Sequence, residues 1–146
     1  MTASPDGVPP GATLVLYDGV CGLCNGVVKF LLRRDRRDRI RFAALQGDLG
    51  RQLVLARGGD PDELSTMWLL RRVGQPDERA WQRGRAGVLA LASLGGAWSL
   101  FHLLRLLPTA LLDLGYRALA GRRYRLGGRL ESCPIPAPEH RRKFVG

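Results

Sequence analysis

The chain has 146 residues and a mass of 16.1 kDa, the common size of one domain, so two full catalytic domains are excluded. With 45% hydrophobic and 25% charged residues, its composition is that of an ordinary globular protein and excludes disordered, collagen-like and coiled-coil classes. Lys and Arg number 23 against 13 Asp and Glu, which gives a net charge of +10. The positive electrostatic field of such a charge attracts nucleic acid, anionic lipid or acidic partners, but it indicates nothing about the fold.

Two further features of the composition bear on the compartment. The longest apolar run, residues 100–112, is broken by His102, Arg105 and Pro108 and is shorter than the ~20 residues of a spanning helix. The first ten residues lack the basic start and apolar stretch of a secretion signal. We therefore expect a cytoplasmic protein. Three cysteines in a reducing compartment argue against a disulfide framework and favour a metal or redox role.

The first half of the chain is predicted to alternate strands and helices. Residues 1–12 are rich in Pro, Gly and Ser and are predicted to form a flexible lead-in. Residues 13–17 read as a buried strand, and the helix that follows ends in the charged segment 33–39. Residues 40–43 are a second strand. Leucines and valine at helical spacing then mark a second helix, which Gly58 and Gly59 stop.

The second half continues this pattern with a hairpin and a further helix. Residues 66–71 are predicted to be a third strand, and turn residues separate it from a short fourth strand at 80–83. A helix follows over residues 86–94. The order βαβ, helix, ββα is that of a thioredoxin-like sandwich, an α/β fold in which helices cover both faces of a four-stranded mixed sheet.

The remaining third is predicted to be an addition to this single domain, which we place at residues 13–130. Two Leu-rich helical stretches, 98–107 and 108–120, should form a hairpin, with Pro108 at a helix start. We expect the hairpin to be buried against the sheet, with weak contact to an anionic membrane surface as the alternative. A basic segment, 122–129, follows, and residues 131–146 are predicted to be a Pro-rich and basic tail.

Cys21 and Cys24 form a C-x-x-C pair where the first strand turns into the first helix. A sulfur at a helix N-terminus faces unpaired backbone N–H groups and the positive end of the dipole, which favour the thiolate. Cys21 is therefore predicted to be the nucleophile. Cys24, one turn further along the same face, is predicted to resolve a mixed disulfide at Cys21.

Other interpretations of this region remain open. The C-x-x-C could be half of a zinc site, completed by Cys133 and His140 with His102 in reserve, but the spacing matches no usual zinc pattern. Asp18, three residues before Cys21, could accept a proton from Cys24 or could simply hydrogen-bond the turn. A carboxylate so close would by itself oppose a thiolate at Cys21.

These residues resemble the DCC family of thiol-disulfide oxidoreductases, a thioredoxin-like group with the signature D-x-x-C-x-x-C. The resemblance covers about 125 residues, roughly one domain. Its motifs are the signature at residues 17–24, the basic helix end at 32–37, the Phe-x-x-Leu-Gln of 42–46, the Leu-Gly-Gly of 94–96, Tyr116 with Arg117, the basic pattern at 121–129 and a final cysteine, Cys133.

The resemblance implies catalytic roles for Asp18, Cys21 and Cys24, no bound cofactor or metal, and a thiol or disulfide substrate, either a protein or a small thiol such as glutathione. Cys133 matches a recurrent cysteine without an assigned role. The sequence departs from the pattern twice. Gly84 and Arg85 replace the usual Ser-Asp before Ala86, and Ser65 and Thr66 precede Met67 where thioredoxins place a proline.

Two functions follow as hypotheses. The first is a thiol-disulfide oxidoreductase that exchanges a Cys21/Cys24 disulfide with its partner. The alternative is a non-catalytic basic binding module in which the C-x-x-C is structural or holds zinc. The Arg-rich segment 33–41 alternates with Asp and is typical of a solvated face with local ion pairs, so no specific nucleic-acid partner is expected. The tryptophans at 68, 81 and 98 are predicted to fill the core or its rim.

Overall fold

The computed structural model describes residues 8–9, 11–19, 21–35, 38–60, 62–63, 67–73, 75–94, 96–127, 141 and 143–145. Its centre is a four-stranded sheet of order β2-β1-β3-β4. The strands are β1 (Thr13–Tyr17), β2 (Ile40–Ala44), β3 (Trp68–Arg71) and β4 (Arg79–Gln82). β1 pairs in parallel with β2 and antiparallel with β3, and β4 closes an antiparallel hairpin with β3. This confirms the predicted mixed sheet.

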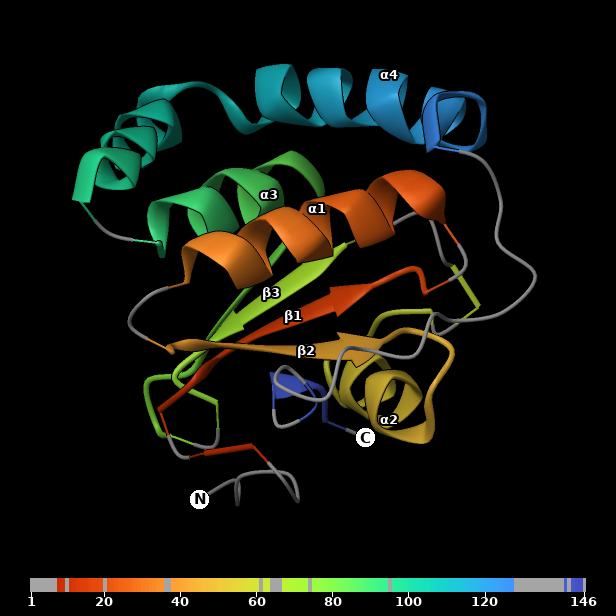
Figure 1. Cartoon of the computed structure of the whole chain (residues 1–146), viewed down its shortest axis with the longest axis vertical. Coiled ribbons are helices and arrows are strands. Elements are labelled where there is room, and N and C mark those ends of the chain that lie inside the picture. Colours follow the sequence, from red (N-terminus) through yellow and green to blue (C-terminus); the bar gives the residue numbers. More distant parts are fainter. Residues whose placement is uncertain are drawn as a thin grey trace.

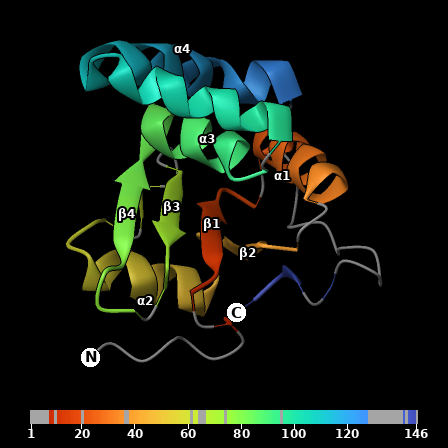
Figure 2. The same cartoon turned by 90° about the vertical axis from the view of Figure 1, so that its left-hand side faces the viewer.

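Helices cover both faces of this sheet. α1 (Gly22–Arg34) and α3 (Arg83–Ala92) lie on one face, and α2 (Asp48–Ala56) lies on the other (Figures 1 and 2). A 3-10 helix, η1 (Gly96–Leu106), and α4 (Thr109–Gly127) form an outer layer over α1 and α3. The arrangement confirms the α/β sandwich expected from the sequence and is consistent with a thioredoxin-like fold.

The alternation of side chains along β1 divides the core in two. Val15 and Tyr17 belong to the apolar cluster that also holds residues of α1 and α3, while Leu14 and Leu16 belong to the cluster that includes Leu53 of α2. Trp68 is buried in the second cluster. Trp81 and Trp98 pack at the edge of the first, as predicted for the tryptophans.

The C-terminal helices differ from the prediction in extent and in packing. The first stretch is a 3-10 helix, and α4 continues to Gly127, although residues 122–129 were expected to be a separate basic segment. No proline interrupts 121–127, so the helix is not forced to end at Ala120. η1 and α4 pack mainly on α1 and α3, because those two helices already cover that face of the sheet, so the predicted burial directly against the sheet was wrong. Several of its leucines are consequently exposed.

The described end of the chain returns to the edge of the sheet. Phe144 forms a parallel bridge with Phe42 of β2, and the Val145 N–H donates to the Phe42 carbonyl at 2.8 Å. Lys143 is buried, with its Nζ 3.0 Å from Oδ2 of Asp35, the residue that caps the end of α1. The sequence predicted a Pro-rich and basic tail over residues 131–146 and did not predict this contact. Residues 131–140, 142 and 146 lie outside the described residues.

Candidate active site

The turn between β1 and α1 places Cys21 at the N-cap of α1. Its backbone is extended, with φ −86° and ψ 121°, and its N–H donates to the Asp18 carbonyl at 3.3 Å. The Cys21 Sγ accepts a hydrogen bond from the Cys24 backbone N–H, with 3.4 Å between sulfur and nitrogen. The sulfur thus occupies the position of an N-cap acceptor, where the unpaired N–H groups of a helix favour negative charge.

The two cysteines differ in accessibility. Neither forms a disulfide, but Cys21 is 0% exposed whereas Cys24 is only partly buried, against the cluster beneath α1. Cys24 is therefore the more accessible of the two sulfurs. Access to the Cys21 sulfur requires a local movement of the residues that cover it.

Asp18 lies in the same turn and is fixed by a residue from another loop. It is 1% exposed, and its Oδ1 accepts a hydrogen bond from Gln46 Nε2 at 2.6 Å. The Gln46 Oε1 accepts in turn from the Gly19 N–H at 2.9 Å. Gln46 follows β2 and is brought here because β1 and β2 are parallel and end at the same edge of the sheet. Its amide thus holds the carboxylate and the backbone of the turn together.

Asn25 fixes the turn from the helix side. It is 8% exposed, and its Nδ2 donates to the carbonyls of Gly19 at 2.8 Å and of Cys21 at 2.9 Å. Sequence reasoning assigned no site role to Asn25 or Gln46. The available signals were a polar residue one position after Cys24 on the first turn of a helix, and a glutamine just after a strand expected to be parallel to the first.

Gln46→Ala is expected to destabilise the fold by about 1–3 kcal/mol, because it removes the hydrogen bonds that Gln46 makes to the buried Asp18 carboxylate and to the Gly19 N–H. Disulfide exchange should slow as well, since the turn that carries Cys21 loses its support. Urea unfolding and exchange rates measure the two effects. Gln52→Ala, at an exposed position of α2, is the matched control and should change stability by less than about 0.5 kcal/mol. Equal behaviour of the two variants would show that Gln46 does not position the turn.

A zinc site at the C-x-x-C would need further ligands, and the described part of the chain supplies none. Among those residues, no group of three or more His, Cys, Asp or Glu side chains lies close enough to hold a metal ion. Cys133 and His140, the predicted completions, lie outside the described residues. His102 is on η1, in the outer helical layer.

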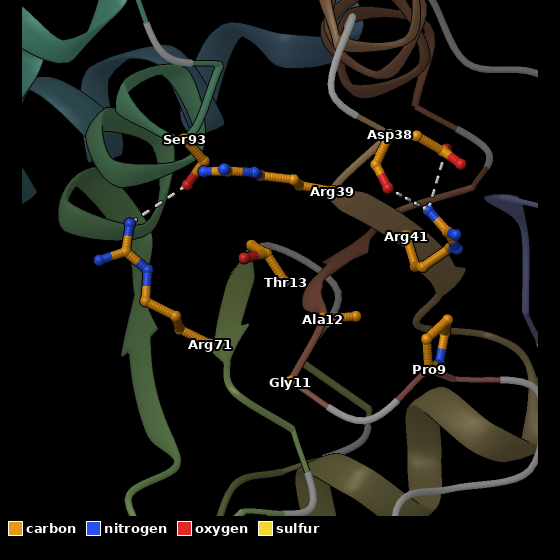
Figure 3. A pocket seen from close by; sticks show the side chains of 9 residues that line it. All are labelled: Pro9, Gly11, Ala12, Thr13, Asp38, Arg39, Arg41, Arg71 and Ser93. Atoms are coloured by element: carbon orange, nitrogen blue, oxygen red, sulfur yellow. Dashed lines mark hydrogen bonds and ion pairs between the residues drawn. The ribbon is translucent and has the colours of Figure 1, made fainter.

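A basic pocket of about 440 Å³ lies at the opposite end of the strands, where β1 begins and β3 ends (Figure 3). Its cations are Arg39, Arg41 and Arg71. Arg41 pairs with Asp38 at 3.2 Å, a local ion pair of the kind expected for the Arg-rich segment, and Arg71 donates to the Ser93 hydroxyl at 3.3 Å. Because Cys21 follows the opposite end of β1, this pocket is not part of the cysteine site.

Comparison with known sequences identifies the family. The model of the DCC1-like thiol-disulfide oxidoreductase family matches residues 15–129, which include the C-x-x-C, Asp18 and Gln46. The chain belongs to this family. Its resemblance to the DCC signature is therefore confirmed, and the family description gives the reaction class, an oxidoreductase acting on thiols and disulfides.

Two relatives of this DCC1-like chain extend over most of its length. The uncharacterized protein YuxK of Bacillus subtilis is 30% identical over 132 residues, 90% of this chain and 93% of the relative. A DCC family protein of Arabidopsis thaliana, described as chloroplastic, is 34% identical over 123 residues, 84% of this chain and 69% of the relative. No solved structure matches the chain. Neither relative's name states a substrate.

Proposed function

We propose that Cys21 and Cys24 alternate between dithiol and disulfide and exchange with a thiol or disulfide partner through a mixed disulfide at Cys21. In the reducing direction, the Cys21 thiolate attacks one sulfur of the partner disulfide, and the other partner sulfur leaves as a thiolate that takes up a proton. Cys24, after losing its proton, then attacks the Cys21 sulfur. The second partner thiol leaves, and two electrons have passed from the pair to the partner.

The observation that carries this proposal is the position of the Cys21 sulfur as the N-cap acceptor of α1, 3.4 Å from the Cys24 nitrogen. Anionic sulfur is the nucleophile in disulfide exchange, and a helix N-terminus stabilises it by the same N–H groups that would otherwise lack partners. The burial of Cys21 adds a requirement to the mechanism. The turn from Asp18 to Cys21 opens before the partner's sulfur can approach.

Asp18 is proposed to accept the proton of Cys24 during the resolving step. A buried carboxylate held by Gln46 in the turn that carries Cys21 is suited to this role. Asp18→Asn keeps an oxygen that can accept the Gln46 hydrogen bond but cannot take up a proton at neutral pH. We expect this variant to form the mixed disulfide at the wild-type rate and to resolve it about 10²-fold more slowly. Unchanged resolution, followed by quenched mass spectrometry, would leave Asp18 only a role in holding the turn.

The partner is proposed to be a protein or a small thiol such as glutathione, and the compartment is proposed to be the cytoplasm, in line with the small cysteine content. Catalysed reduction of glutathione mixed disulfides and of a protein disulfide tests the function directly. The wild-type protein should accelerate at least one of the two above the rate with free thiol alone. No acceleration of either, together with stoichiometric zinc in the purified protein, would favour a structural C-x-x-C in a basic binding module.

A further inference from the structure

The outer helical layer exposes six leucines that no element covers in the described part of the chain. We call this set the leucine face. It runs along η1, the link after it and the first turns of α4, and its members are Leu100 (68% exposed), Leu103 (63%), Leu106 (84%), Leu107 (37%), Leu111 (52%) and Leu114 (66%). Among the described residues, the only other large exposed apolar side chains are Val27 and Leu55. Exposed apolar side chains that gather on one part of a protein commonly mark an interaction surface, and these six leucines all lie within residues 100–114.

The same layer is anchored to the domain through its other side. Trp98 packs edge-on against Phe30 of α1, with ring centroids 5.4 Å apart, and stacks on Phe101. The Tyr116 hydroxyl accepts a hydrogen bond from the Met67 N–H at 2.8 Å. Trp98 and Tyr116 therefore attach this layer to the domain, whereas the six leucines stay exposed.

The charges around the leucine face favour an anionic partner. Residues 96–127 contain five arginines, at 105, 117, 122, 123 and 125, and a single acid, Asp113. Arg117 and Arg122 are exposed on α4. Leucine is under-represented among the residues that dominate protein–protein binding, where Trp, Tyr and Arg prevail. A leucine surface next to arginines instead has the composition of a segment that lies in the interface of an anionic bilayer.

The shape of the layer suits shallow insertion. No single described helix is long and apolar enough to cross a membrane. Gly96–Leu104 and Thr109–Ala118 reach the required length and apolar composition only when they are taken together, and the chain bends by 110° between them. This layer is also the outermost one, on the side of the molecule away from α2 (Figures 1 and 2). It can thus meet a flat surface without displacement of the sheet.

We propose that the leucine face docks this protein on the surface of a membrane containing anionic lipid, with the leucines inserted among the acyl chains and the α4 arginines at the headgroups. The inference is independent of the redox function. It is tested by sedimentation of the full chain with vesicles of phosphatidylcholine containing roughly one third phosphatidylglycerol. Binding is expected to be strong at about 0.1 M salt and to weaken at about 0.5 M, because salt screens the arginines.

Leu103→Gln combined with Leu106→Gln should lower the partition constant about tenfold or more. Leu55→Gln, at a leucine 59% exposed on α2, is the matched control and should bind as the wild type does. Circular dichroism of each variant verifies the fold. Two results would overturn the proposal. The first is equal binding by all variants, or none by the wild type. The second is a dimer in the absence of lipid that the double variant makes monomeric, which would assign the leucine face to a second copy of this chain.

Discussion

Cys21→Ser is expected to lower the rate of disulfide exchange by about 10³-fold or more, because removal of a covalent nucleophile leaves no route to the mixed disulfide. The same variant should form no adduct with a disulfide substrate when the reaction is quenched and analysed by mass spectrometry. The fold should persist, since a serine hydroxyl can accept the Cys24 N–H bond in place of the Cys21 sulfur.

Cys24→Ser should behave differently, because it retains the attacking sulfur and removes the resolving one. The mixed disulfide at Cys21 is expected to accumulate, and turnover to stop after one event. Cys133→Ser is the control with a cysteine outside the pair and should turn over as the wild type does. An adduct on Cys24 in the Cys21→Ser variant would mean that Cys24 is the attacking thiol and Cys21 the resolving one. That outcome has a structural basis, since Cys24 is the more accessible of the two thiols.

Lys143→Met is expected to destabilise the fold by about 3–5 kcal/mol, because it leaves the Asp35 carboxylate without the ammonium that neutralises it in a buried site. The side chains are 6% and 1% exposed, and the Lys143 Nζ lies 3.0 Å from Asp35 Oδ2. The same carboxylate accepts the N–H groups of Arg39 and Ile40 and so joins the end of α1 to the start of β2. Urea unfolding measures the loss.

A surface ion pair supplies the control for this variant. Arg51 lies 3.0 Å from Asp62, with side chains 43% and 78% exposed, and Arg51→Met should cost less than about 1 kcal/mol. The exposed pair is screened by water, whereas the buried pair is not. A loss below 1 kcal/mol for Lys143→Met as well would mean that the C-terminal residues do not secure the edge of β2.

Local signals in the sequence were sufficient to predict the central elements. Strand β1 coincides with the predicted run 13–17, because Asp18 and Gly19 directly after the apolar stretch fix the end of the strand. The helix after Cys21 ends at Arg34, inside the charged segment where an end was expected. The four-stranded mixed sheet follows from the order of these elements, since a short turn dictates the β3–β4 hairpin.

Features that depend on distant residues were not predictable in this way. Gln46 contacts Asp18 across 28 positions, and Lys143 contacts Asp35 across 108. Asp35 itself was interpreted as part of a solvated charged face, and only the returning C-terminal residues make it a buried ion-pair partner. The position of Cys21 at the helix N-terminus was predictable from its spacing. Its burial was not, because accessibility depends on how the turn packs.

We propose above all that Cys21 and Cys24 form one reversible redox pair. Its most direct measurement is a titration of the Cys133→Ser protein in glutathione buffers, with alkylation of free thiols and mass spectrometry at each ratio. We expect one two-electron transition, in which both thiols disappear together into an intramolecular disulfide. Two thiols that stay reduced throughout, or that acquire glutathione separately without pairing, would contradict it.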